Sequence, residues 1–204
     1  MTIAFVAIAY LIGSVSFAVL VSRGFGLPDP RSYGSSNPGA TNVLRSGRKT
    51  AAILTLIGDT AKGWIAVALA WHFVPDQNVA IAAAAAGLAV VIGHMYPLFF
   101  GFRGGKGVST ALGALFGFSP WLGLATLVTW LIIAFFFRLS SLAALVSCLF
   151  APFFCFLLFG PHAFTWSVIA MALLLVWRHR NNIRNLLAGT EGRIGERNTG
   201  TPGG

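Results

Sequence analysis

Long apolar runs alternate along the chain with short polar segments rich in glycine. The runs cover residues 3–22, 51–74, 79–100, 108–137, 139–159 and 164–177. Most of them reach the length of about 20 apolar residues that a helix needs to cross a bilayer. The first run has no basic segment before it and no cleavage site of small residues, so it is expected to be a retained span and not a signal peptide. The pattern predicts an all-α integral membrane protein.

The run 108–137 is too long for one membrane helix. At about 1.5 Å per residue its 30 residues would extend about 45 Å, against a hydrocarbon core of about 30 Å. Pro120, which follows "FGFS", is well placed to interrupt it. We therefore expect a short helix over 108–118 and another over 121–137, which gives a bundle of seven transmembrane helices, some of them short.

The basic residues favour the same number of helices. With the N-terminus outside and the C-terminus cytoplasmic, the cytoplasmic segments hold thirteen of the fourteen Lys and Arg residues, whereas six helices would leave Arg138 or the basic tail outside. The remaining base, Lys62, follows Asp59 by three positions, so the two are expected to pair on one helix face inside the membrane.

Composition excludes several classes of protein. Hydrophobic residues make up 56% of the chain and charged residues 9%, and the mean hydropathy is +0.79, which a water-soluble domain of this size could not bury. The net charge of +9 does not indicate nucleic acid, because no basic stretch is interleaved with aromatic residues. Cys148 and Cys155 lie in one apolar run and are expected to be packing residues. Few acids and no paired histidines predict no metal and no cofactor.

Three polar segments are expected to face the cytoplasm: "YGSSNPGATNVLRSGRKT", "GHMYPLFFGFRGGKGVST" and "WRHRNNIRNLLAGTEG". Singly, they are compatible with a helix-capping loop, a flexible hinge and a basic cluster that contacts anionic lipid. Together they supply what a phosphate site needs, namely backbone N–H groups near glycines, hydroxyl and amide donors, and fixed cations.

Lys106 stands at the centre of the second segment. Gly104, Gly105 and Gly107 would let the backbone approach an anion, and the following residues open a helix whose amides point at the same place. The spacing is not that of a Walker A loop, because three residues separate the first glycine from Gly-Lys and a glycine follows the lysine. A single phosphate group is therefore favoured over a nucleotide.

"YGSSNPGATNVLR", "GHMYPLFFGFRGGKGVST" and "RHRNNIRNLLAGTEG", in this order between short spans, resemble the bacterial membrane acyl-phosphate:glycerol-3-phosphate acyltransferase family, PlsY. The resemblance covers essentially the whole chain. It implies transfer of an acyl chain from acyl phosphate to the 1-hydroxyl of sn-glycerol 3-phosphate, the first step of phospholipid synthesis, giving lysophosphatidic acid and phosphate. It also implies seven transmembrane helices and a site that opens to the cytoplasm.

The resemblance implies these site residues: Lys106, His179, Asn182, Ser35 and Arg45 as catalytic, and Asn37, Thr41, Asn42, Gly104, Gly105, Gly107, Arg184 and Glu191 as substrate-binding. Acyl phosphate is a mixed anhydride whose leaving group needs no protonation, so cations and amide donors suffice, and no G-x-S-x-G nucleophile is present. We expect Lys106, with Thr41 and Asn42, to hold the acyl phosphate.

We expect Arg45, Ser35 and Asn182 to hold glycerol 3-phosphate. Either His179 or the substrate's own phosphate would accept the hydroxyl proton, and both alternatives stay open. His94, near the cytoplasmic end of its span, is expected to be a structural hydrogen-bonder.

The sequence departs from the pattern of the family at several positions: Ser36, Pro38, Arg103, Asn181, Asn185 and Gly192. Arg103 stands where lysine is expected, which alters the donor geometry at that position. The other departures leave the main donors in place.

Other classes of function remain. A transporter for a small phosphorylated anion would explain the interrupted run and the pair Asp59 and Lys62, but the polar donors lie in loops and the two halves of the chain show no repeat. A lipid-scaffolding protein would explain the composition but not the loops.

The family reading predicts one acyltransferase domain over 1–198, with 199–204 as a disordered tail or an expression remnant outside the fold. It also predicts a multi-pass protein of the bacterial inner membrane with a cytoplasmic site. The lipid bilayer and a soluble enzyme that supplies acyl phosphate are its expected partners.

Overall fold

The computed structural model describes residues 2–195, which form helices joined by turns and loops with no strand among them. The all-helical fold is therefore confirmed. In chain order the helices are α1 (Thr2–Gly13), α2 (Phe17–Gly24), α3 (Ala40–Leu44), α4 (Lys49–Phe73), η1 (Asp76–Asn78), α5 (Val79–Met95), η2 (Leu98–Phe100), α6 (Val108–Phe118), α7 (Pro120–Phe137), α8 (Ser140–Phe159), α9 (Ala163–Arg178) and α10 (Arg180–Leu187).

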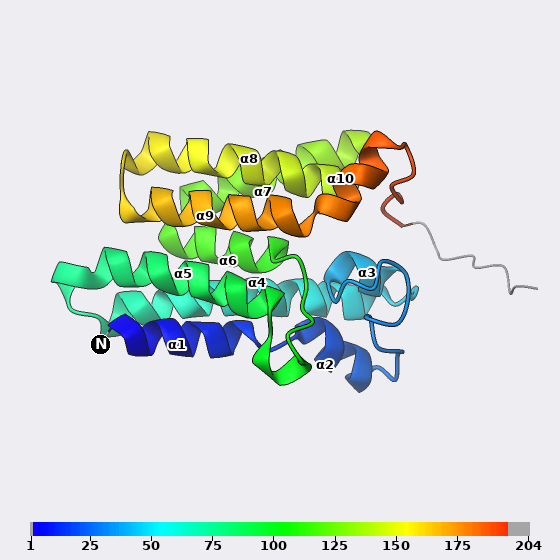
Figure 1. Ribbon diagram of the computed structural model, residues 1–204, viewed down its shortest axis with the longest axis horizontal. Helices are drawn as coiled ribbons and strands as arrows, with labels where there is room; N and C mark the ends of the chain where they lie inside the picture. The colour runs from blue at the N-terminus through cyan, green and yellow to red at the C-terminus, as the bar shows by residue number, and fades with distance from the viewer. Residues whose placement is uncertain (1, 196–204) are drawn as a thin grey trace, which may run out of the picture.

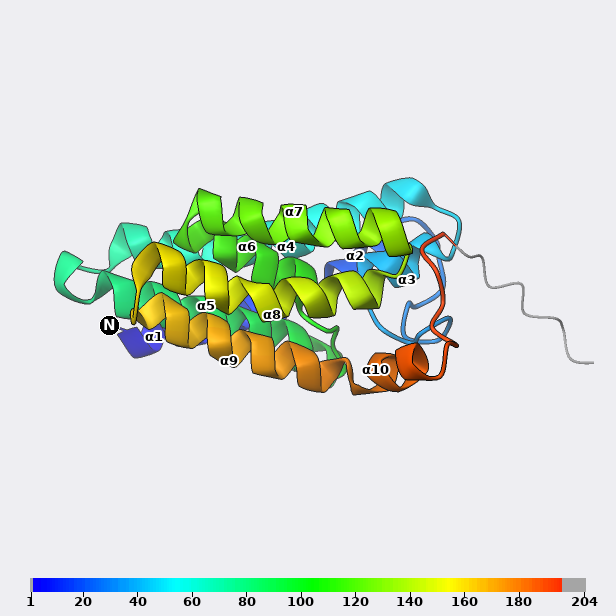
Figure 2. The ribbon, with the colours of Figure 1, turned by 90° about the horizontal axis from the view of Figure 1, so that it is seen from above.

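The long helices run along one axis, and α2, α3 and α10 lie at one end, called here the polar end (Figure 1). α6 lies between the group α1, α4 and α5 and the group α8 and α9 in this view. After a turn of 90°, α7 and α9 lie on opposite sides of α8 (Figure 2). The predicted tail 199–204 lies outside the described residues.

Residues 2–195 contain five segments long and apolar enough to cross a membrane: Ile3–Gly24, Lys49–Phe73, Val79–Phe100, Pro120–Phe137 and Ser140–Phe159. α6 and α9 are apolar but shorter, at 11 and 16 residues. Large apolar side chains face outward, with Phe135 79% and Leu173 68% exposed, as lipid-facing positions require. An integral membrane protein is confirmed, while the crossing of the membrane by seven helices stays a prediction.

The interruption near Pro120 forms as expected. α6 ends at Phe118 and α7 begins at Pro120, where the missing N–H of proline costs no helical hydrogen bond. The run 79–100 is also interrupted, because Pro97 disfavours helical geometry at the residue before it and α5 ends at Met95.

The run 3–22 was expected as one span, and it lies within one candidate span, Ile3–Gly24, although its helix is interrupted and forms α1 and α2. The break leaves the carbonyl of Val15 without a helical partner, and the Lys62 ammonium group donates to this oxygen at 2.7 Å. A contact with a distant helix therefore stabilises the break, which follows Gly13 and ends at Ser16, the N-cap of α2.

α4 and α6 approach each other closely through glycines. A Cβ atom on Gly63 would lie 2.1 Å from the carbonyl oxygen of Thr110, and one on Gly113 would lie 1.9 Å from that of Thr60. Small residues allow such contacts between membrane helices, where packing replaces the hydrophobic effect as the main source of association. This contact fixes α6, whose first turn follows Lys106.

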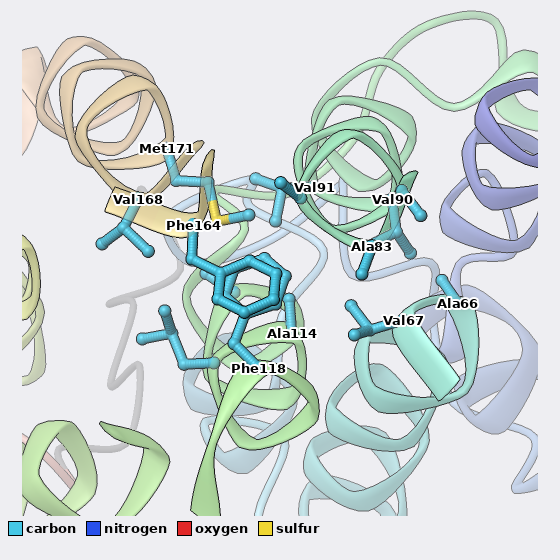
Figure 3. Packing of buried hydrophobic residues seen from close by; sticks show 14 of the residues in the cluster. Ala66, Val67, Ala83, Val90, Val91, Ala114, Phe118, Phe164, Val168 and Met171 are labelled. Carbon is cyan, nitrogen blue, oxygen red and sulfur yellow. The ribbon is translucent and has the colours of Figure 1, made fainter. Parts of the chain in front are cut away.

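A buried cluster closes the bundle away from the polar end. The rings of Phe118 and Phe164 stack with their centroids 4.6 Å apart, and Val168 and Met171 of α9 lie beside them (Figure 3). Because this cluster is densely packed, it holds α6 and α9 together below the site.

Candidate active site

A cavity of about 940 Å³ lies between the three polar segments and the helices below them. Its wall is polar where these segments meet and apolar where α4, α6, α7, α8 and α9 form it. The polar wall includes Ser35, Asn37, Thr41, Asn42, Arg45, His94, Lys106, Gly107, Ser109, Ser140, Ser141, His179, Asn182, Asn185, Thr190 and Glu191. Segments far apart in the sequence therefore share one site, as the sequence analysis predicted.

A chain of hydrogen bonds joins the second polar segment to the third. The Lys106 ammonium group donates to the amide oxygen of Asn182, whose amide nitrogen donates to Glu191 at 2.6 Å. Burial lowers the pKa of Lys106 to about 8, against the opposing effect of Glu191, and the charges of Arg178 and Arg45 lower it further. Lys106 is thus still mainly protonated at neutral pH and can bind an anion.

The glycine loop 104–107 is fixed from two sides. Gly107 has a φ of +87°, which favours glycine, and a Cβ atom on Gly104 would lie 2.0 Å from the carbonyl oxygen of His94. On the other side Arg178 donates to the carbonyl oxygens of Gly104 at 2.9 Å and Gly105 at 3.0 Å. The loop is therefore held in one conformation around Lys106.

His179 lies between α9 and α10 and is 3% exposed. Its Nδ1 lies 2.7 Å from the carbonyl oxygen of Leu175, which can only accept, so Nδ1 carries the proton and Nε2 is the free acceptor. Burial lowers the pKa of His179 to about 4, with the hydrogen bond to Leu175 opposing the shift. His179 is therefore a neutral imidazole at pH 7.

The first polar segment folds around Asn42, which is 2% exposed. Its amide nitrogen donates to the carbonyl oxygens of Pro30 at 2.7 Å and Tyr33 at 3.1 Å, and its amide oxygen accepts from the N–H of Ser35 at 3.0 Å. These bonds place Ser35 and Arg45 at the cavity. Arg45 forms no ion pair within the described part of the chain, so its guanidinium is available to an anion.

Ten of the thirteen predicted site residues lie in the wall of the cavity, and three do not. Gly104 and Gly105 pack against the end of α5, outside the wall of the cavity. The Gly105 N–H donates to the carbonyl oxygen of His94 at 3.1 Å, so this amide is not free for an anion, whereas binding by the Gly104 amide stays a prediction. Arg184 is exposed on α10, outside the wall. Contact between Arg184 and a bound substrate stays a prediction.

Several residues at the site were not predicted from the sequence. Arg178 had no role assigned beyond the basic cluster, and Ser140 and Ser141 were hidden at the start of an apolar run. Thr41 and Ser140 hydroxyls lie 3.1 Å apart, and Ser141 Oγ is buried without a partner in the described residues. The signal that could have identified these serines is their position shortly after Arg138, at the expected cytoplasmic end of a span.

The apolar part of the cavity extends away from the polar end. Its wall includes Leu112 and Leu115 of α6, Ala144 and Ala151 of α8, and Met171 of α9. At about 1.5 Å per residue, Ala151 lies about 10 Å further along α8 than Ala144. A cavity polar at one end and apolar along this length suits an amphiphile with a charged headgroup and an alkyl chain.

Comparisons with known proteins agree with this geometry. The sequence profile of the family described as glycerol-3-phosphate acyltransferase matches residues 3–189. Proteins named glycerol-3-phosphate acyltransferase from Burkholderia vietnamiensis (strain G4 / LMG 22486) and Burkholderia multivorans (strain ATCC 17616 / 249) are 64% and 65% identical over 193 residues, covering 93% of this chain and 89% of each relative.

Two solved structures of PlsY (YgiH), an integral membrane glycerol 3-phosphate acyltransferase, are also similar. The glycerol 3-phosphate form has a TM-score of 0.88 at 40% identity and covers 95% of this chain and 96% of that one. The lysophosphatidic acid form has a TM-score of 0.86 at 39% identity, with 94% of each chain covered. The protein therefore belongs to the glycerol-3-phosphate acyltransferase family.

Proposed function

We propose that this protein transfers an acyl chain from acyl phosphate to the 1-hydroxyl of sn-glycerol 3-phosphate, releasing lysophosphatidic acid and phosphate. The observation that carries the proposal is the single cavity in which a cluster of cationic and amide donors continues into an apolar groove. The donor substrate has the same two parts, an anionic phosphoryl group and an alkyl chain. Family membership and the substrate and product named for the PlsY structures support the assignment.

The reaction forms a bond between the glycerol oxygen and the acyl carbon and breaks the bond between that carbon and the phosphate oxygen. Lys106 holds the phosphoryl group of the donor, while Arg45, Ser35 and Asn182 hold glycerol 3-phosphate beside it. Positioning of the hydroxyl and stabilisation of charge on the carbonyl oxygen and the leaving phosphate supply most of the rate enhancement. Thr41 and Glu191 complete the site, with Glu191 orienting Asn182.

The proton of the attacking hydroxyl goes to one of two acceptors. His179 offers a neutral Nε2 in the wall of the cavity, and a substrate phosphate offers an anionic oxygen with a pKa near about 6. The reaction is balanced with either acceptor, because the proton ends on that acceptor and the phosphate leaves as an anion.

The bundle is proposed to cross the bacterial inner membrane seven times, as one domain over 1–198, with its N-terminus outside and the cavity open to the cytoplasm. The concentration of basic residues in the segments of the polar end supports this orientation. A soluble enzyme that makes acyl phosphate would then deliver its product on the side where the cavity lies.

Purified protein in detergent, incubated with palmitoyl phosphate and glycerol 3-phosphate, tests the function. Mass spectrometry should detect lysophosphatidic acid in amounts equal to the phosphate released and dependent on glycerol 3-phosphate. Uptake of glycerol 3-phosphate into sealed vesicles without any such product would favour the transporter and overturn the proposal.

A further inference from the structure

A buried polar cluster lies beneath the glycine loop, inside the membrane-spanning part of the bundle. It consists of Asp59 and Lys62 of α4, His94 of α5 and Thr110 of α6, and none of these residues is more than 6% exposed. The Lys62 ammonium group lies 2.8 Å from Asp59 Oδ1, which confirms the predicted pair. His94 Nδ1 lies 3.5 Å from the same oxygen and 3.1 Å from the hydroxyl of Thr110.

Stability does not explain such a cluster. Removing two charges from water costs more than their attraction commonly returns, so a buried ion pair is often no more stable than apolar residues of the same volume. Within a membrane the cost is larger, and ionisable residues there are commonly functional. Asp59 and Lys62 therefore call for an explanation at the site above them.

His94 connects the buried pair to both sides of Lys106. Its carbonyl oxygen accepts the N–H of Gly105 at 3.1 Å, and its Nε2 would lie 2.2 Å from a Cβ atom on Gly105, so the ring rests against the loop. Its Nδ1 contacts Thr110 in the first turn of α6, four residues after Lys106. His94 thus contacts residues on both sides of Lys106, Gly105 through its carbonyl oxygen and ring and Thr110 through Nδ1.

Asp59 fixes this imidazole. The carboxylate lies 3.5 Å from Nδ1, a longer contact than the 3.1 Å to Thr110, and its negative charge favours the tautomer with the proton on Nδ1. Lys62 neutralises Asp59 and also donates to the carbonyl oxygen of Val15, which anchors the pair to the break between α1 and α2.

We propose that Asp59 and His94 are positioning residues, which hold the glycine loop so that the Lys106 ammonium group reaches Asn182 and the phosphoryl group of the substrate. The inference rests on the proposed function, because it assigns Lys106 to that phosphoryl group. Neither residue is proposed to touch the reacting atoms.

Two sets of variants test the inference. Thr110→Val keeps the shape of the side chain but removes the partner of His94 Nδ1, whereas Thr110→Ser keeps the hydroxyl. The double variant Asp59→Asn, Lys62→Met removes both charges together, so that neither is left buried alone. Thermal unfolding establishes which variants fold. If the double variant does not fold, the comparison of Thr110→Val with Thr110→Ser tests the inference by itself.

Binding of inorganic phosphate and KM for palmitoyl phosphate are measured for each folded variant. We expect Thr110→Val and the double variant to bind phosphate about tenfold more weakly and to have a KM about tenfold higher. For Thr110→Ser, both values should stay within about twofold of those of the original protein. Equal impairment of the Thr110→Val and Thr110→Ser proteins, or full phosphate binding by a folded double variant, would overturn the inference. Absence of acyl transfer by the unaltered protein would count against the proposed function alone, because phosphate binding is read separately.

Discussion

Lys106 and Asn182 are 76 positions apart in the chain, yet the ammonium group of Lys106 donates a hydrogen bond to the amide oxygen of Asn182. The amide nitrogen of Asn182 continues this chain to Glu191. Asn182 thus orients the cation that faces the cavity, while Glu191 prevents the amide from rotating. The contact joins two polar segments that the membrane helices separate in the sequence.

Replacement of Asn182 by alanine should lower kcat/KM by about a hundredfold, the loss typical of one preorganised polar group in an active site. The reason is that Lys106 loses its orienting partner and Glu191 loses its donor. Steady-state measurement of phosphate release gives the value. Asn181→Ala is the matched control, because Asn181 is exposed on the same helix and lies outside the wall of the cavity; equal losses in the two variants would contradict the assignment.

Activity should decline as the pH rises through the pKa of Lys106. Burial lowers this pKa to about 8, and the protonated amine is the form that binds a phosphate. The value of kcat/KM is therefore expected to fall as the pH rises above about 8. Any residual activity of Lys106→Arg should lack this decline, because a guanidinium stays charged over the whole range. If Lys106→Arg showed the same decline, the titration responsible would belong to a group other than Lys106.

His179 should make the protein less stable as the pH falls. Its pKa is about 4 in the folded protein against an ordinary 6.5, so the unfolded chain binds the proton first. The free energy of unfolding should fall by up to about 3 kcal/mol as the pH decreases from about 6.5 to about 4. Chemical denaturation in detergent at several pH values measures the slope. A His179→Gln protein with the same slope would show that the proton binds elsewhere.

The pH profile of the same enzyme separates the two acceptors of the hydroxyl proton. If His179 accepts it, kcat/KM should hold down to about pH 4, where the imidazole becomes protonated. If a substrate phosphate accepts it, the rate should fall below about pH 6. Retention of most of the activity by His179→Gln would leave the imidazole an orienting role only.

Arg178 should require its guanidinium geometry and not merely its charge. The side chain donates to the carbonyl oxygens of Gly104 and Gly105 and lies over the ring of Tyr96, 5.4 Å from its centroid. A lysine ammonium group cannot reproduce the planar arrangement of donors that a guanidinium offers to the two carbonyl oxygens. Arg178→Lys is therefore expected to lower kcat/KM by about tenfold. Arg180→Lys, at an exposed position beside Trp177, should have little effect. Full activity of Arg178→Lys would show that the loop needs no support from α9.

The sequence predicted those features that depend on local composition. Apolar runs marked the long helices, Pro120 marked the boundary of α7, and the spacing of Asp59 and Lys62 marked an ion pair that forms at 2.8 Å. The three polar segments were expected to meet, because each connects spans on one side of the membrane, and all three contribute to the cavity.

The features it did not predict depend on contacts between distant helices. The break between α1 and α2 follows Gly13, and the hydrogen bond from Lys62 that stabilises it comes from a distant helix. Gly104 and Gly105 were expected to approach an anion, but their lack of side chains serves packing against His94. A glycine motif indicates that the backbone must approach something closely, and only the fold shows what it approaches.

The central claim is that one cavity holds the phosphoryl group of an acyl donor against Lys106. Formation of lysophosphatidic acid from palmitoyl phosphate and glycerol 3-phosphate by purified Lys106→Ala tests it most directly, with Arg103→Ala as the control from the exposed part of the same segment. We predict that Lys106→Ala folds with an unchanged thermal midpoint and loses at least about a thousandfold in kcat/KM, while Arg103→Ala stays near the original rate. Near-normal product formation by a folded Lys106→Ala protein would contradict the account.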